Sequence, residues 1–334
     1  MKTIDIAIVG ATGMVGSTVL ALLEERGFPV GRLYLLASAR SAGEEYDFRG
    51  ESLLVADVAE FDFSQSTLCF FCASSKVAAQ YIPIAIAKGN RVIDKSAHFR
   101  YDDNIPLVIP EVNGDALLKT SQLIAVPNCS TIPIAMVLKP IYDAVGITRV
   151  NIATYQSVSG TGKEGVSELA EQTAQLLNGS PIKKKVYAQQ IAFNVLPHID
   201  DFEENGYTRE EMKVVRELQK IFSDVNLKIN PTAVRVPVFY GHSAAVHIET
   251  REKCSAKDAI RLLRKMPGVE VITGKHPYPT PVQDAAGEDS VYVGRVRDDI
   301  SCDNGLNLWV VCDNVRKGAA LNGVQIAEAM LAFI

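Results

Sequence analysis

Short apolar segments alternate with helix-like patterns along the first third of the chain. Ile4–Val9 reads as a buried strand, and Val15, Val19, Leu22 and Leu23 then recur on one face of a helix. The alternation continues with predicted strands at 33–37, 53–56, 68–73, 91–93 and 107–109 and a predicted helix at 76–88. Repeated β-α-β units predict a doubly wound parallel sheet.

The pattern changes after residue 127, where we predict a helix from Pro133, a strand at 148–156 and a helix at 164–177. Thr208 and Glu211 form a capping box that opens a further helix. We predict its inner face from Met212, Val215, Leu218 or Gln219, and Phe222. A last helix from Gly318 is predicted to pack back on the first domain. Because 334 residues exceed one usual core, we expect two domains, the second an α/β domain with a mixed sheet.

A glycine-rich turn joins the first strand to the first helix. Gly10, Gly13 and Gly16 follow a GxxGxxG spacing rather than GxGxxG. Glycine lets the backbone approach a pyrophosphate, and a helix N-terminus supplies N–H groups and positive potential. The setting predicts a Rossmann-type dinucleotide site; the alternative is a turn made only for tight packing.

The residues at the end of the second strand determine whether a Rossmann domain binds NAD or NADP. An NAD site usually has an acidic residue there for the ribose 2′-OH. This chain instead has Ser38, Arg40 and Ser41, and a guanidinium between hydroxyls suits a 2′-phosphate. We therefore predict NADP rather than NAD, with a solvated loop arginine as the alternative.

A thiol lies where an apolar strand-like run stops at Pro127 and a new helix begins. Cys129 falls just before that helix, whose exposed N–H groups favour a thiolate and could hold an oxyanion. Asn128 precedes it and Ser130 follows it. We predict a nucleophile, against the alternative of a small buried apolar residue.

Other charged and ring side chains could belong to a site. Arg100, past a strand end, could clamp an anion or form a surface salt bridge. His242 follows a glycine at a strand start and is placed like a functional residue, whereas we read His247, in mid-strand, as structural. Glu210 and Lys213 share a helix face, so pairing within the helix is the simpler reading.

Composition narrows the class of protein. A net charge of −5 gives no reason to expect nucleic acid or an acidic membrane as partner. No apolar run approaches the roughly 20 residues of a membrane span, and the N-terminus lacks a signal-peptide layout, so we predict a cytoplasmic protein. Six cysteines show no disulfide framework, and we read the CxxC of Cys69 and Cys72 as core rather than a metal site.

Taken in order, ten stretches of the chain resemble the aspartate-β-semialdehyde dehydrogenase family over essentially its whole length. They are 10–16, 38–43, 96–100, 127–132, 156–162, 191–200, 210–213, 235–246, 293–297 and 314–328. The resemblance implies an NADP-binding Rossmann domain at 1–127, completed by the C-terminal helix 317–334, and a catalytic and dimerisation domain at 128–316. It also implies a homodimer, which could pair into a tetramer.

The resemblance further implies roles for individual residues. Cys129 matches the nucleophile, His242 the acid–base residue, and Gln156 the residue that orients the acyl-enzyme. Arg235 matches the clamp on the substrate carboxylate and Glu210 the group facing its ammonium, while Arg100, Asn128 and Lys213 match the phosphate site. The matching cofactor contacts are Gly10, Thr12, Gly13, Met14, Val15, Ser38, Arg40, Ser41, Ser159, Gly160 and Gln325.

The implied reaction is the NADPH-dependent reduction of L-aspartyl-4-phosphate to L-aspartate-β-semialdehyde through a Cys129 thioester, in lysine, threonine, methionine and diaminopimelate biosynthesis. One alternative is N-acetyl-glutamyl-phosphate reductase, whose acylated amine carries no charge for Glu210 to bind. The other is a non-catalytic paralogue that binds NADP. Cys129, Gln156, Arg235 and His242 are all present, which favours an active enzyme.

Overall fold

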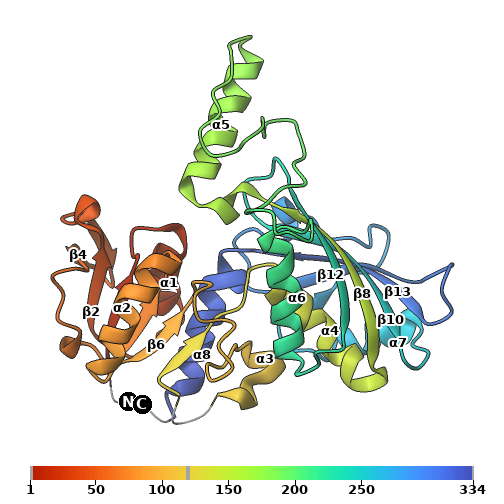
Figure 1. The fold of residues 1–334 in the computed structure, drawn as a ribbon, viewed down its shortest axis with the longest axis horizontal. Helices are drawn as coiled ribbons and strands as arrows, with labels where there is room; N and C mark the ends of the chain where they lie inside the picture. The colour runs from red at the N-terminus through yellow and green to blue at the C-terminus, as the bar shows by residue number, and fades with distance from the viewer. Residues whose placement is uncertain (1–2, 118–120, 333–334) are drawn as a thin grey trace. The chain divides into compact units, whose positions relative to one another are not determined.

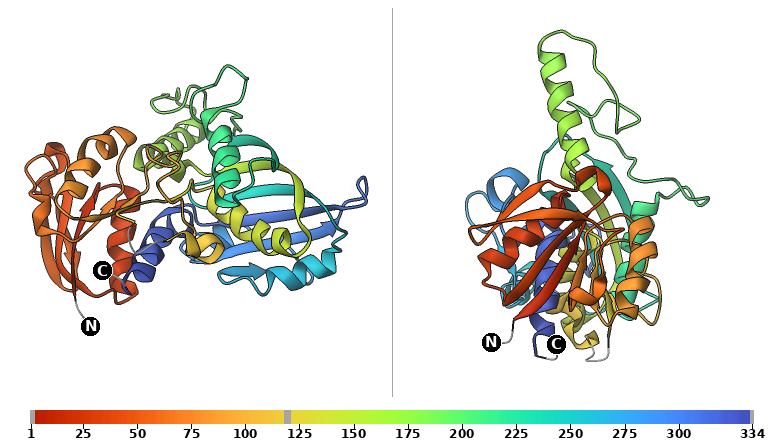
Figure 2. Two further views of the ribbon diagram at one scale, coloured as in Figure 1. Left: turned by 60° about the horizontal axis from the view of Figure 1, so that its bottom comes forward. Right: turned by 90° about the vertical axis from the view of Figure 1, so that its left-hand side faces the viewer.

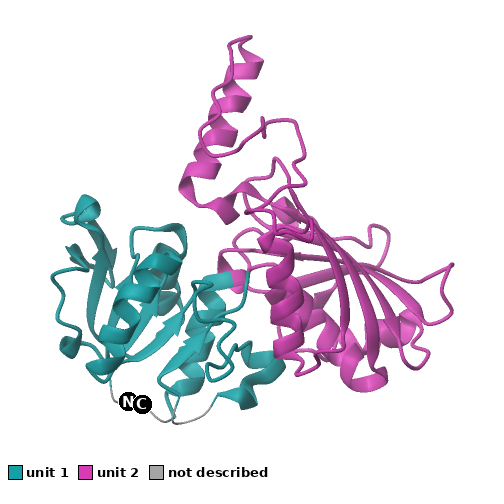
Figure 3. Cartoon of the chain, in the orientation of Figure 1, with its two compact units in different colours: residues 1–128, 319–334 teal, residues 129–318 magenta. Residues whose placement is uncertain are grey.

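The computed structural model describes residues 3–117 and 121–332. The chain divides into two compact units, shown in Figure 3. Unit 1 consists of residues 1–128 and 319–334, and unit 2 of residues 129–318. Among the residues with described positions, no helix is both long and apolar enough to cross a lipid bilayer.

Unit 1 is built on a seven-stranded sheet of order β3-β4-β2-β1-β5-β6-β7. Strands β2, β4 and β6 of this sheet are labelled in Figure 1. Its strands are β1 (Ile4–Val9), β2 (Val30–Ala37), β3 (Glu45–Phe48), β4 (Glu51–Asp57), β5 (Leu68–Phe71), β6 (Arg91–Asp94) and β7 (Leu123–Ala125). Its α-helices are α1 (Met14–Glu25), α2 (Ser75–Ala87), α3 (Pro110–Asn113) and α8 (Leu321–Met330). Every neighbouring pair of strands is parallel except β3 with β4, so the predicted doubly wound sheet is confirmed.

The central strands are apolar on both sides because helices cover both faces of this sheet, as the right-hand view of Figure 2 shows. Ala7 and Val9 pack with Leu36, Phe71 and Ile82 in one buried cluster. Ile6 and Ile8, which point to the opposite face of β1, are equally buried. An uninterrupted apolar strand is therefore the sequence signature of this half of the chain.

Three details of unit 1 differ from the prediction. The segment 107–109 is not a strand but makes a single bridge, from Leu107 to Ala125, because Pro110 starts α3 at once. The hairpin of β3 and β4 was not predicted; Arg49 and Gly50, both at positive φ, form its two-residue turn. The last helix starts later than expected, since a π-helical turn at Arg316–Ala320 precedes α8.

Unit 2 holds a six-stranded sheet of order β11-β12-β13-β10-β8-β9. Its strands are β8 (Ile147–Gln156), β9 (Lys228–Arg235), β10 (His242–Thr250), β11 (Val269–Val271), β12 (Val291–Asp298) and β13 (Gly305–Cys312). Its helices are α4 (Thr131–Val145), α5 (Lys163–Leu177), α6 (Arg209–Ile221) and α7 (Ala256–Leu263). β8 pairs parallel to β9 but antiparallel to β10, so the sheet is mixed, as predicted.

Helix α4 packs against β10, β12 and β13, with α6 and α7 beside it. Its buried side chains include Ile134, Met136, Leu138 and Ile141. In Figures 1 and 2, α5 stands away from the sheet of unit 2. The buried side of α4 thus fixes the start of that helix, and Cys129 just before it, against the sheet.

The predicted inner face of α6 is wrong, although its capping box is confirmed. Thr208 Oγ1 accepts from the Glu211 N–H, and Glu211 Oε2 accepts from the Thr208 N–H at 2.7 Å. The buried residues of α6 are Glu210, Glu211, Val214, Glu217, Leu218 and Ile221. A hydrophobic pattern assigns carboxylates to the solvent-facing side, but here hydrogen-bonded carboxylates are buried. The buried face of α6 is therefore displaced by one residue from the predicted face.

The glycine turn of unit 1 leads to a stability prediction. A Cβ on Gly16 would lie 2.1 Å from Gly10 O and 2.8 Å from Ala11 Cα, so the backbone of the turn itself would have to move. We expect Gly16→Ala to lower the free energy of unfolding of unit 1 by about 3 kcal/mol, as overpacking does. Urea unfolding followed by circular dichroism measures the loss.

Gly13→Ala is the matched control for that substitution. A Cβ on Gly13 would meet only Gly10 O, at 3.3 Å, and its backbone is extended. We expect its cost to stay below about 1 kcal/mol. Equal losses for the two variants would show that the close approach at Gly16 does not set the packing.

Candidate active site

Cys129 lies just before α4, with Ser130 at the N-cap position and Pro133 in the first turn of the helix. Proline there costs no hydrogen bond, because the first N–H groups of a helix have no partner within it. Gly318 faces the cysteine: a Cβ at that position would be 3.3 Å from Cys129 Cβ. The thiol thus sits at the positive end of a buried helix, the setting predicted from the sequence.

His242 is the partner of Cys129. It is the first residue of β10, is buried, and places Nε2 3.4 Å from Cys129 Sγ. Burial, and next the positive charge of Arg235, lower the pKa of His242 well below its usual value. The imidazole is therefore neutral at pH 7 and faces the sulfur. The two residues, 113 positions apart, meet as a predicted nucleophile and proton-transfer pair.

A short turn of small residues borders this pair. A Cβ on Gly160 would lie 2.9 Å from an Arg235 guanidinium nitrogen and 3.2 Å from His242 Nε2. Glycine therefore leaves an open space over both side chains. Ser159, beside it, is buried and hydrogen-bonds through its hydroxyl to Asn314 Oδ1 at 3.0 Å. Both residues were predicted as cofactor contacts, and the space above Gly160 is one that any other side chain would fill.

Arg235 ends β9 and is a buried cation. One guanidinium nitrogen donates to the carbonyl of Ser157 at 2.7 Å, while Nε is buried without a hydrogen-bond partner. Within residues 3–117 and 121–332 no carboxylate forms an ion pair with it. A buried charge without a counter-ion is costly, so Arg235 is suited to bind an anion.

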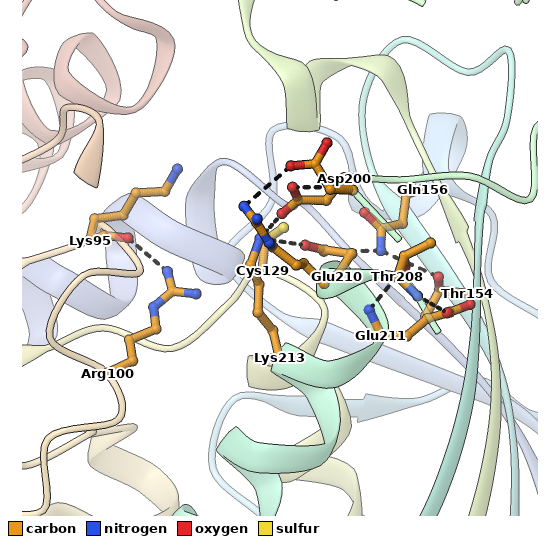
Figure 4. A network of polar contacts seen from close by, with 12 residues as sticks. Lys95, Arg100, Cys129, Thr154, Gln156, Asp200, Thr208, Glu210, Glu211 and Lys213 are labelled. Carbon is orange, nitrogen blue, oxygen red and sulfur yellow. Dashed lines mark hydrogen bonds and ion pairs between the residues drawn. The ribbon is translucent and has the colours of Figure 1, made fainter. Parts of the chain in front are cut away.

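Figure 4 shows a chain of polar contacts that ends on α6. Gln156 Nε2 donates to Glu210 Oε1 at 3.3 Å, and Lys213 Nζ contacts Glu210 Oε2 at 3.2 Å. The same ammonium is closer to Asp200 Oδ2, at 2.7 Å. The predicted pairing of Glu210 with Lys213 is confirmed, but Lys213 is shared with a second carboxylate.

The glycine turn of unit 1 fits a dinucleotide phosphate. Gly10 has φ of +84°, which glycine adopts without strain, and a Cβ on it would meet Cys72 O at 2.7 Å. Gly13 is the N-cap of α1 and provides no side-chain cap. The N–H groups of the first turn can therefore bind an anion. Thr12, Met14 and Val15 belong to the same turn and helix start.

Arg40 lies in a single 3₁₀ turn, Ala39–Ser41, directly after β2. The residue is exposed, and no described side chain pairs with its guanidinium. Ser38 and Ser41 flank it in the same turn. An exposed guanidinium between two hydroxyls, at the end of the second strand, has the donors and the charge to bind a 2′-phosphate.

Three further predicted site residues, Arg100, Asn128 and Gln325, lie in unit 1. Arg100 is buried and donates to the carbonyl of Lys95 at 2.7 Å, as Figure 4 shows. Asn128 is buried as well. Gln325, on α8, donates to Glu111 Oε1 at 2.9 Å. His247, read as structural, contacts Asp299 and Asn151 across the sheet of unit 2.

Four of the other five cysteines do not have the surroundings of a reactive thiol. Burial raises the pKa of Cys69 and of Cys72 to about 12, and it also raises those of Cys254 and Cys312. All six cysteines are free thiols. Across the described part of the chain, no group of three histidine, cysteine or acidic residues could hold a metal ion.

Three polar residues of the site were not singled out from the sequence. Ser157 contacts His242, Asn314 accepts hydrogen bonds from the turn after β8, and Asp200 holds Lys213. Asp200 adopts φ of +69°, a region that aspartate tolerates better than most residues. Their partners are 13 to 157 positions away along the chain, beyond the reach of a helix or strand pattern.

Both halves of the chain match models of known families. Residues 5–120 match the semialdehyde dehydrogenase NAD binding domain, and residues 138–317 match the semialdehyde dehydrogenase dimerisation domain. Together the two matches cover most of the chain.

Two proteins with similar sequences are both named aspartate-semialdehyde dehydrogenase. The aspartate-semialdehyde dehydrogenase of Shewanella sp. (strain DB6705) is 56% identical over 98% of this chain and 97% of its own. Aspartate-semialdehyde dehydrogenase 2 of Vibrio cholerae is also 56% identical, over 98% and 97%.

Solved structures agree with these relatives. Aspartate semialdehyde dehydrogenase II from Vibrio cholerae, complexed with ASA, superposes with a TM-score of 0.98 at 54% identity, covering 99% of each chain. A probable aspartate-semialdehyde dehydrogenase from Pseudomonas aeruginosa gives 0.94 at 38% identity, again over 99% of each. By two family models and by relatives matched over nearly its full length, the chain belongs to the aspartate-semialdehyde dehydrogenase family.

Proposed function

We propose that this protein is an NADP-dependent aspartate-semialdehyde dehydrogenase that interconverts L-aspartyl-4-phosphate and L-aspartate-β-semialdehyde plus phosphate. The observation that carries the proposal is the contact of Cys129 Sγ with His242 Nε2, at 3.4 Å, in a site bordered by a buried arginine with no counter-ion. A nucleophile beside a proton-transfer residue suits acyl chemistry, and the arginine suits a substrate carboxylate.

Cys129 performs the covalent steps. Its thiolate attacks the acyl carbon, a carbon–sulfur bond forms, and the bond to phosphate breaks to leave a thioester. When bound, the nicotinamide cofactor supplies the hydride that reduces this thioester. The carbon–sulfur bond of the resulting thiohemiacetal then breaks, which releases the aldehyde and regenerates the thiolate. His242 faces the sulfur and donates a proton to the acyl oxygen, which becomes negatively charged when the thiolate or the hydride adds to the carbonyl carbon. Gln156 orients the acyl group.

The charges of the site complement the charges of this substrate. Arg235 binds the α-carboxylate, and Glu210 binds the ammonium. Arg100, Asn128 and Lys213 bind the phosphate. On the cofactor, Gly10, Gly13 and the start of α1 hold the pyrophosphate, Arg40 holds the 2′-phosphate, and Gly160 leaves room beside the reacting groups. Gln325 makes a further contact with the cofactor.

Two other functions fit the geometry less well. The substrate of N-acetyl-glutamyl-phosphate reductase has a neutral amide in place of the ammonium, so it offers no positive charge to the buried Glu210 carboxylate. A paralogue that binds NADP without turnover would have no use for a histidine within reach of the thiol. We also propose a cytoplasmic homodimer, able to form a tetramer, that serves lysine, threonine, methionine and diaminopimelate synthesis.

A single assay tests the proposed function. We expect phosphate-dependent reduction of NADP⁺ with L-aspartate-β-semialdehyde and none with N-acetyl-glutamate semialdehyde. Cys129→Ala should abolish turnover while NADPH still binds, as fluorescence titration would show. A folded protein that binds NADPH yet is silent with both substrates would indicate the paralogue, and turnover by Cys129→Ala would exclude this nucleophile.

Alkylation by iodoacetamide should single out Cys129. At pH 7.5 the buried thiols Cys69 and Cys72 stay protonated, because their pKa values are raised and a thiol is charged only above its pKa. We expect Cys129 to be modified first and the semialdehyde to protect it. Peptide mass spectrometry after short exposures identifies the site; faster modification of Cys302, which is half-buried, would contradict the assignment.

Arg235→Leu should raise the KM for the semialdehyde far more than it changes kcat. A charge-assisted pair is worth roughly 1.5–3 kcal/mol, or about 10- to 100-fold in binding. Steady-state kinetics measure the change. Arg209→Leu is the matched control, since Arg209 makes only an exposed pair with Asp201 at 3.3 Å. An unaltered KM in Arg235→Leu would show that Arg235 does not bind the substrate carboxylate.

Arg40→Ala should narrow the preference for NADP over NAD by about tenfold or more, because one charge-assisted contact to the 2′-phosphate is lost. The ratio of kcat/KM for the two cofactors measures it. Arg32→Ala, an exposed arginine within β2, controls for the general loss of positive charge. If the ratio stays constant, another group reads the 2′-phosphate.

A further inference from the structure

The ring of His242 is held from behind by one residue, Ser157. The Ser157 N–H donates to His242 Nδ1 at 3.1 Å, and the Ser157 hydroxyl lies 3.0 Å from the same nitrogen. The Ser157 carbonyl in turn accepts from Arg235 at 2.7 Å. Ser157 is fully buried and directly follows Gln156, so all three of its polar groups serve the site.

These contacts determine where the proton of His242 lies. A backbone N–H can only donate, so Nδ1 must offer it a lone pair. A neutral imidazole carries a single proton, which must then be on Nε2. A protonated ring would turn an N–H toward the Ser157 N–H. Burial, and next the charge of Arg235, lower the pKa of His242 and outweigh a backbone hydrogen bond with Gly241 that raises it. The site therefore holds one tautomer of one charge state.

That tautomer presents a donor to the sulfur. Nε2 is the nitrogen 3.4 Å from Cys129 Sγ, so its N–H points at the group that carries the charge. Hydrogen bonds to an ionised acceptor are about twice as strong as neutral ones. The opposite tautomer would turn a lone pair toward a thiolate. A neutral His242 of this form favours the thiolate without itself being charged.

Asn314 keeps Ser157 in place. Its Oδ1 accepts from the Gly241 N–H at 3.0 Å, and the hydroxyls of Ser157 and Ser159 lie 3.1 and 3.0 Å from the same oxygen. Gly241 is the residue before His242. One buried amide oxygen therefore ties the start of β10 to the turn that holds the imidazole.

We propose that Ser157 is a positioning residue, which fixes His242 in the tautomer with its proton on Nε2 so that the neutral ring donates a hydrogen bond to Cys129. The position of the proton on His242 does not depend on the proposed function; only the role of that proton in turnover rests on it. Ser157 touches neither the sulfur nor a substrate. It acts through the imidazole, and it prepares the ring to donate to charge on the sulfur or on a substrate oxygen.

Nitrogen NMR of the whole protein tests the tautomer directly. The chain has five histidines, and the signals of His242 in ¹⁵N-histidine-labelled protein are found by their loss in His242→Gln. At pH 7.5 we expect Nε2 protonated and Nδ1 unprotonated. A proton on Nδ1, or a charged ring, would overturn the proposal. Neither substrate nor cofactor is needed, so the result does not depend on turnover.

Ser157→Ala tests the hydroxyl. The main-chain N–H remains, so the tautomer should persist, but the looser ring donates less well to the thiolate. We expect the alkylation rate of Cys129 at pH 7 to fall about threefold to tenfold, with an equal rate at high pH where the thiolate is complete. The pH midpoint of alkylation thus moves upward. A merely structural loss would lower the rate equally at every pH.

Ser157→Thr keeps a hydroxyl and should return the midpoint toward that of the natural protein. An unchanged midpoint in a folded Ser157→Ala variant would refute a role for the hydroxyl. If the NMR and alkylation results hold while the semialdehyde assay is silent, the proposed function fails and the positioning of His242 stands.

Discussion

A buried positive charge without an anion is the constraint on which the site of unit 2 depends. Arg235 ends β9, is almost wholly removed from solvent, and keeps one nitrogen without a hydrogen-bond partner. Among the residues that the structure describes, its acceptor is the carbonyl of Ser157, so the guanidinium fixes the turn that also holds His242. Its charge adds to the effect of burial in lowering the pKa of that ring, and its side chain leaves room only for a glycine at position 160. The arrangement is complete only when an anion occupies it.

Those parts of the fold that follow from local pattern could be predicted from the sequence. The apolar strands of unit 1 are buried on both faces, and such strands are continuous runs that a pattern detects. The start of α4 behind Cys129 and the capping box of α6 also lie within a few residues of one another. The segment 107–109 was misread because an apolar run says nothing of whether its neighbours can pair with it.

The sequence allowed the reacting groups of the site to be predicted, but not the residues that hold those groups in position. Cys129 and His242 are chemical types that attract attention at a helix start and a strand start. Ser157, Asn314 and Asp200 are ordinary residues whose importance arises when chain segments far apart in sequence meet. The same limit explains α6: Glu211 is buried because it accepts from the Ala233 N–H at 2.8 Å, a partner that no helical pattern can reveal.

The sharing of Lys213 has a consequence for selectivity. Asp200, Glu210 and Lys213 place two carboxylates and one ammonium on the side of the site that holds Gln156. Arg235 contributes a separate positive charge on β9. Under the proposed function, carboxylates on one side and a guanidinium on the other complement the two charges of a zwitterionic substrate. A free amino acid neutralises both at once, whereas a molecule with only one of the two charges leaves the other exposed to the low dielectric of the interior.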